Sequence, residues 1–148
     1  YRNKHSYGDC CECINTSILK EYRWPEISGI KFIPESYVLD KIGVHYDLIC
    51  TNEIFKYVEY LDDGTTKNVS DFQRKNNIGF LVNYDDKIDN IFKVTSIPIK
   101  KKIYTWLLYW EGVSQDVQKE GPRVKSIGML GYIVKFFAPL INIIRGFS

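Results

Sequence analysis

The longest apolar run of the chain is its C-terminal segment, residues 126–148, with the sequence SIGMLGYIVKFFAPLINIIRGFS. The strongly polar interruptions in this run are Lys135, Asn142 and Arg145. At helical spacing, large apolar side chains cover most of the circumference. One narrow stripe holds the small, polar and helix-breaking residues Gly128, Gly131, Lys135, Pro139, Asn142 and Gly146. The pattern predicts a C-terminal hydrophobic helix whose apolar side is covered by a protein core, a partner or a bilayer.

Upstream of this segment, apolar and polar residues alternate along several stretches, as is typical of β-strands. Residues 54–61 alternate, Asp62-Asp63-Gly64 follows as a tight turn, and residues 65–69 return. An Asp-Gly turn between two such runs predicts a β-hairpin. Further strands are predicted over residues 44–51, 78–84 and 91–99.

Two segments fit more than one kind of element. Residues 36–41 predict either one helical turn or a strand. Residues 103–110, IYTWLLYW, are apolar throughout, which is typical of a strand buried on both faces or of a short core helix. The polar segment 111–125 that follows contains glycine and proline and is predicted to be a hinge.

The composition favours strands in the body of the chain. It holds 19 Ile against 9 Leu, 11 Tyr, and a single alanine, Ala138. Ile and Tyr suit a pleated surface, and the best helix former is nearly absent, although an AT-rich genome would produce the same bias. We therefore predict an α+β fold: a small antiparallel β-rich domain of about 5–6 strands over residues 1–125, followed by a hydrophobic helix over residues 126–148.

Charge and motifs limit the classes of function. Basic and acidic residues nearly cancel, at 20 and 18, and the longest basic run is Lys100-Lys101-Lys102. Nucleic-acid binding needs a more concentrated basic surface, so no nucleic-acid partner is predicted. The chain contains no Gly-rich phosphate loop, no Gly-x-Ser-x-Gly and no His-Glu-x-x-His. We therefore expect a non-catalytic protein without a cofactor.

Four cysteines, Cys10, Cys11, Cys13 and Cys50, are crowded toward the N-terminus. Disulfide geometry separates the two Cα atoms, so bridges within the N-terminal cluster would be strained. We predict one disulfide between Cys50 and one of Cys10, Cys11 or Cys13. The two remaining thiols would pair with another chain, bind metal, carry lipid or stay reduced.

Histidine and cysteine also suggest a zinc site. His5 precedes Cys10, and His45 precedes Cys50, with the same spacing. The ligand set would be His5, Cys10, Cys13, His45 and Cys50. Because neither pair has the usual Cys-x2-Cys spacing, no metal site is predicted. Two sequons, at Asn15 and Asn68, are candidate glycosylation sites if the chain is extracellular or lumenal.

Three interpretations of the C-terminal segment remain open at this stage. As a core helix it needs cover on nearly its whole circumference and a partner for Lys135. As a membrane-spanning helix, residues 127–144 would extend about 27 Å, close to the hydrocarbon thickness. Lys135 would then cost about 2.5–3.5 kcal/mol near mid-bilayer. As an interfacial helix it would combine cations on one side with Phe and Ile on the other.

The predicted function is that of a membrane-associated accessory subunit or protein-interaction module. Its partner would be membrane lipid or a membrane protein, bound through residues 126–148, in a larger or disulfide-linked complex. The predicted contact residues on the apolar side are Tyr132, Phe136, Phe137, Ile141 and Ile144. Lys135 and Arg145 would meet phosphate headgroups or carboxylates. The alternatives are a secreted, disulfide-containing binding or toxin-like protein, and a zinc protein or enzyme that uses the His and Cys residues.

Overall fold

The described part of the chain is helical. The computed structural model describes residues 12–49, 51, 53–54, 56–57, 59, 68–116 and 124–146, and of residues 140–146 it describes the backbone alone. The helices are α1 (Thr16–Glu21), α2 (Ser36–His45), α3 (Val69–Lys75), α4 (Asn77–Asp86), α5 (Phe92–Val94), α6 (Ile99–Gln115) and α7 (Met129–Gly146). A π-helical turn, η1 (Lys87–Ile91), joins α4 to α5.

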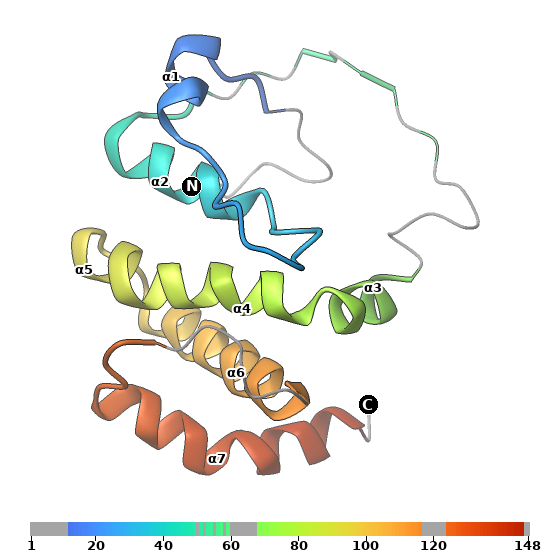
Figure 1. Cartoon of the computed structure of the whole chain (residues 1–148). Coiled ribbons are helices and arrows are strands. Elements are labelled where there is room, and N and C mark those ends of the chain that lie inside the picture. The colour runs from blue at the N-terminus through green and yellow to red at the C-terminus, as the bar shows by residue number, and fades with distance from the viewer. Residues whose placement is uncertain are drawn as a thin grey trace.

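The helices form successive layers (Figure 1). α2 packs on α4 and η1, α4 packs on α6, and α6 packs on α7. In the view of Figure 1, α7 is the lowest layer, and the segment that contains α1 and α2 lies above α4. Helix α7 is therefore an outer layer, with α6 on one side of it.

Aromatic side chains of α6 occupy the centre of the core. The buried cluster consists of Leu81, Ile88, Trp106, Leu107, Tyr109, Val124, Val134 and Ala138. The rings of Trp106 and Tyr109 meet edge to face, with centroids 5.5 Å apart, and Trp106 stacks on Trp110 at 6.0 Å. Such pairs contribute about 0.5–1.5 kcal/mol beyond the area they bury. The core thus joins α4, α6 and α7 into one unit.

Helix α6 approaches α4 closely at Gly112. A Cβ atom there would lie 2.9 Å from Leu81 Cδ2, so only glycine fits without a shift. The Asn77 side-chain amide donates a hydrogen bond of 2.8 Å to the Gly112 carbonyl oxygen. This bond satisfies two polar groups at the crossing of the two helices.

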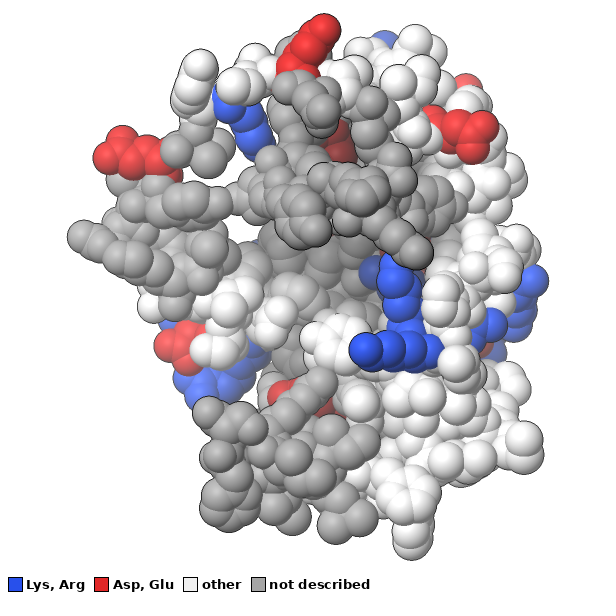
Figure 2. All heavy atoms as spheres, turned by 180° about the vertical axis from the view of Figure 1, so that it is seen from behind, with Lys and Arg blue, Asp and Glu red and all other residues white. Residues whose placement is uncertain are grey.

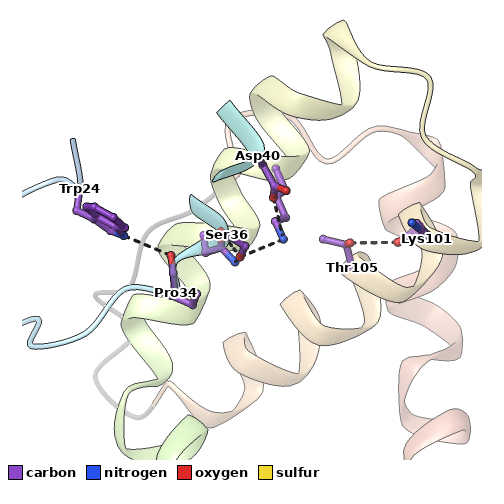
Figure 3. A network of polar contacts seen from close by, with 8 residues as sticks. Trp24, Pro34, Ser36, Asp40, Lys101 and Thr105 are labelled. Carbon is purple, nitrogen blue, oxygen red and sulfur yellow. Dashed lines mark hydrogen bonds and ion pairs between the residues drawn. The ribbon is translucent and has the colours of Figure 1, made fainter. Parts of the chain in front are cut away.

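A polar network attaches α2 to α4 and η1 (Figure 3). The buried Asn83 amide donates to Ser36 Oγ at 3.1 Å, and Lys87 Nζ forms an ion pair with Asp40 at 3.0 Å. Lys41 forms a second ion pair, at 3.1 Å, with Asp86. Because these contacts are only partly exposed, they hold α2 in a defined position on α4 rather than only solubilising the surface.

The predicted β-rich domain is wrong, because the described residues contain no strand. Residues 78–84 belong to α4, residues 36–41 to α2 and residues 103–110 to α6. For the last two segments a helix was the alternative prediction. The segment 91–99 holds the end of η1, the short α5 and the start of α6. Residues 44–45 end α2, and residues 46–49 form no regular element.

The error has a physical cause in the period of the apolar residues. In α6, Ile103, Trp106, Leu107, Trp110 and Val113 recur at the spacing of a helix, and all five are buried or packed on the core. Residue preference for strands is a weak prior, and packing of an apolar helix face overrides it. The composition therefore favoured the wrong element where the spacing of apolar residues already indicated a helix.

The predicted hairpin falls mostly outside the described residues. Its turn, residues 62–64, and its returning segment up to residue 67 are not described. The residues of the first predicted strand that are described, at positions 54, 56, 57 and 59, form no strand.

Candidate functional site

The segment before α7 is anchored to the core by two backbone hydrogen bonds. The Lys125 backbone N–H donates to Asp89 Oδ2 at 2.8 Å, and the Val124 backbone N–H donates to the Tyr109 hydroxyl at 3.3 Å. Asp89 and Tyr109 are both buried. These bonds set the point from which α7 starts, beside η1 and α6.

One side of α7 is packed against α6. Val134 and Ala138 are buried on this side, and Gly131 lies against the indole of Trp106. A Cβ atom at Gly131 would lie 2.8 Å from Trp106 Cη2 and Cζ2, which is closer than real contacts allow. The Trp110 indole N–H donates to the Gly131 carbonyl oxygen at 3.0 Å. Small residues thus bring the backbone of α7 onto the tryptophans of α6.

The opposite side of α7 exposes large apolar side chains. We call this surface the α7 apolar face, and it consists of Met129, Tyr132, Ile133, Phe136 and Phe137, which are 80, 62, 48, 77 and 48% exposed. The Phe136 and Phe137 rings contact each other edge to face, with centroids 5.3 Å apart. Contiguous exposed apolar surfaces are often interaction sites, so the α7 apolar face is the candidate site of this protein.

Lys135 lies at the border of the α7 apolar face. Its side chain is exposed, and its Nζ lies 4.9 Å from the centroid of the Trp110 ring. A cation at this distance from an indole is attracted by the negative face of the ring. The contact keeps the ammonium group beside the apolar face and still in contact with solvent.

The structure brings together some of the predicted contact residues. Tyr132, Phe136, Phe137 and Lys135 are exposed on one helix. The side chains of Ile141, Ile144 and Arg145 lie outside the described residues. Met129 and Ile133 were missed, although their spacing from Tyr132 and Phe136 is the spacing of one helix face.

The predicted stripe of small and polar residues does not match the packed side of α7. Gly131 is packed as the stripe implies, but Lys135 and Pro139 are exposed, and a side chain at Gly128 would meet open space. The packed side is formed by Gly131 together with Val134 and Ala138. A protein core therefore covers one side of the helix and leaves the aromatic side uncovered.

Membrane spanning was one of the three interpretations of this segment. Among the residues that the structure describes, no helix combines the length and the hydrophobicity needed to cross a bilayer.

The cysteine and metal predictions fall largely outside the described residues. Cys13 is exposed and carries a free thiol, and no disulfide is seen in the described part of the chain. Cys10, Cys11, Cys50 and His5 are not described. No group of three or more potential metal ligands is found among the described His, Cys, Asp and Glu residues.

The two sequon asparagines are exposed at the starts of short helices. Asn15 caps α1, because its Oδ1 accepts hydrogen bonds from the Ser17 backbone N–H at 2.9 Å and from the Ser17 hydroxyl at 2.6 Å. Asn68 precedes α3. Capping by Asn stabilises a helix start, which explains Asn15 without a glycan. Glycosylation of either residue stays a prediction.

A groove of about 760 Å³ lies between the segment 27–32 and helices α3 and α4. Its walls are mainly backbone and apolar side chains, with Lys31 and Lys75 as the charged residues. The lining residues include no carboxylate, imidazole or thiol.

Comparisons with protein-family models, with curated proteins and with solved structures find no match for this chain.

Proposed function

We propose that the protein is a non-catalytic interaction protein that attaches to a membrane surface through the α7 apolar face. The observation that carries the proposal is the exposure of five large apolar side chains on the side of α7 that faces away from α6. Tyr132 supports the proposal, because tyrosine is enriched where protein meets the bilayer interface, and phenylalanine is typical of the apolar side of interfacial helices.

The position of α7 supports contact with the surface of a bilayer. One side of the helix is held on α6 by Gly131, Val134 and Ala138. Helix α7 is the lowest layer of the molecule in Figure 1, and its apolar face is exposed to solvent. An interfacial helix lies in this orientation, with its apolar side buried about 5–10 Å into the boundary between headgroups and acyl chains.

The apolar contribution to this attachment is moderate. Complete burial of one large apolar side chain is worth about 1.5–3 kcal/mol. The exposed parts of the five side chains together equal about three complete side chains, so inserting them contributes about 5–9 kcal/mol before the cost of association. The cost of association, which is at least about 4 kcal/mol, leaves weak, reversible binding in the absence of a second attraction.

Flotation with phospholipid vesicles tests the proposal. The change is the double substitution Met129→Ser and Phe136→Ser, which removes the two most exposed apolar side chains of the face. We expect the wild-type chain to float with the vesicles and the double variant to bind at least about tenfold more weakly. Neither side chain is buried, so the thermal unfolding midpoint should stay close to that of the wild type.

The matched control is Val69→Ser, which removes an exposed apolar side chain from α3. It should float as the wild type does. The proposal is wrong if the wild type stays at the bottom of the gradient with every vesicle, or if the double variant floats unchanged. If the unbound wild type then sediments as a dimer and the double variant as a monomer, the face is instead an interface between two copies.

A further inference from the structure

The segments that contain α5, the start of α6, and α7 carry basic residues but no acidic ones. Residues 91–110 and 124–148 contain no Asp or Glu, so all 18 acidic residues of the chain lie elsewhere. The same two segments contain seven basic residues: Lys93, Lys100, Lys101, Lys102, Lys125, Lys135 and Arg145. The chain as a whole is nearly neutral. Its segments 91–110 and 124–148, which contain α5, most of α6 and all of α7, are basic, and the rest of the chain is acidic.

Contacts place the described lysines of this set on neighbouring elements. The Lys125 backbone N–H donates to Asp89 of η1, and η1 directly precedes α5, the helix that contains Lys93. The Nζ of Lys102 lies 5.6 Å from the centroid of the Phe92 ring, which joins the start of α6 to α5. Lys135 lies over Trp110.

These lysines are available for an external anion. Lys93, Lys100 and Lys101 are exposed, as is Lys135. The ion pairs between described residues are made by Lys41, Arg74 and Lys87, which lie outside this set. Figure 2 shows lysine or arginine side chains beside a broad surface without charged atoms at the lower right, where α7 forms the lowest layer of the molecule.

Exposed apolar residues lie among the lysines at the start of α6 as well. Val94, Ile99 and Tyr104 are 65, 61 and 52% exposed. Lys100 and Lys101 follow Ile99 directly. The surface therefore has apolar groups that enter a hydrocarbon boundary and cations that meet phosphate groups above it.

We infer that the α7 apolar face and the lysines of α5, α6 and α7 form one surface that recognises anionic phospholipid. This inference rests on the proposed membrane attachment and adds the class of lipid. Each cation near an anionic membrane strengthens binding about fivefold. Stable membrane attachment takes two signals, for example an apolar anchor and a basic patch. The α7 apolar face supplies the first signal, and these lysines supply the second.

The experiment compares flotation with phosphatidylcholine vesicles and with vesicles that also contain phosphatidylserine, at low and at high salt. The variant is Lys100→Gln with Lys101→Gln, which removes two exposed charges from the basic set. The matched control is Lys20→Gln with Lys31→Gln, two exposed lysines of the acidic remainder. Thermal unfolding of each variant checks that it folds.

We expect the wild type to bind the phosphatidylserine vesicles at least about 25-fold more tightly than the phosphatidylcholine vesicles, and salt to reduce this preference. The Lys100 and Lys101 variant should lose about 25-fold on these vesicles and nothing on phosphatidylcholine. Equal binding of the wild type to both vesicles would overturn the inference and leave the proposed attachment standing. A salt-sensitive preference that the variant retains would overturn the assignment to these lysines.

Binding to neither vesicle would instead remove the proposed attachment itself, and a protein partner for the same surface would then be the better explanation.

Discussion

At the scale of single residues, Gly131 decides how closely α7 approaches α6. The Trp106 ring occupies the space that any Cβ atom at this position would need. Replacement of Gly131 by alanine therefore forces the ring or the helix to move, and overpacking of this kind costs about 1–3 kcal/mol. We expect Gly131→Ala to lower the free energy of unfolding by this amount in urea denaturation.

Gly128 provides the matched control, because a Cβ atom there would have no neighbour within 4 Å. Gly128→Ala should change the free energy of unfolding by no more than about 0.5 kcal/mol. Equal effects of the two substitutions would show that the contact between Gly131 and Trp106 does not limit the packing of α7.

Tyr84 makes stability depend on pH in the alkaline range. Burial, followed by the nearby Tyr104 and Glu111, raises the pKa of Tyr84 to about 12. In the unfolded chain a tyrosine pKa is about 10, so the folded state binds more protons between these two values. The stabilising effect is complete below pH 10 and is lost as the pH rises toward 12, by at most about 1.4 kcal/mol per pH unit.

The measurement is the free energy of unfolding as a function of pH for the wild type and Tyr84→Phe. The variant should lose stability less steeply above pH 10, because it has no buried phenol to ionise. Tyr132→Phe, on the exposed face of α7, controls for the removal of a phenol. An alkaline slope that is identical in the wild type and Tyr84→Phe would contradict the assignment.

At the scale of elements, α7 has two sides with different partners. Gly131, Val134 and Ala138 face the core, whereas the side that includes Met129 and Phe136 is exposed. If α7 served only the core, polar side chains would suit its exposed side better than apolar ones. The proposed membrane attachment explains why this side is apolar.

Removal of α7 tests its structural side. A chain that ends at Lys125 loses Val134 and Ala138 from the core and uncovers the Trp106 ring. We expect it to lose several kcal/mol of stability, because each large vacancy in a core costs about 2–5 kcal/mol. Urea denaturation followed by tryptophan fluorescence measures the change, and an unaltered midpoint would show that α7 is not part of the core.

The same result determines which variants suit the membrane experiments. A chain without α7 would lose stability and membrane contact together, so the two effects would be confounded. Substitutions of Met129 and Phe136 leave the packed side of α7 intact and therefore test attachment by itself.

At the scale of the whole molecule, the arrangement of the helices gathers charges that are far apart in the sequence. The run Lys100-Lys101-Lys102 is too short to indicate an electrostatic partner when it is considered alone. The fold brings Lys102 beside Phe92 of α5 and Lys125 beside η1, so this run lies on elements that neighbour those of Lys93 and Lys125. A nearly zero net charge therefore conceals a division that suits an oriented contact with an anionic surface.

The sequence alone determined that residues 126–148 carry a wide apolar surface, because the strongly polar residues Lys135, Asn142 and Arg145 cover only a narrow part of a helix circumference. It also determined that the acidic residues avoid two segments of the chain. It did not determine strands or helices for residues 78–110, because short apolar runs rich in Ile, Tyr and Trp suit both until their neighbours are known. The stacking of α4, α6 and α7 decided this in favour of helices. The tertiary structure also decided which side of α7 is exposed, because the small Gly131 admits Trp106 and turns the aromatic side outward.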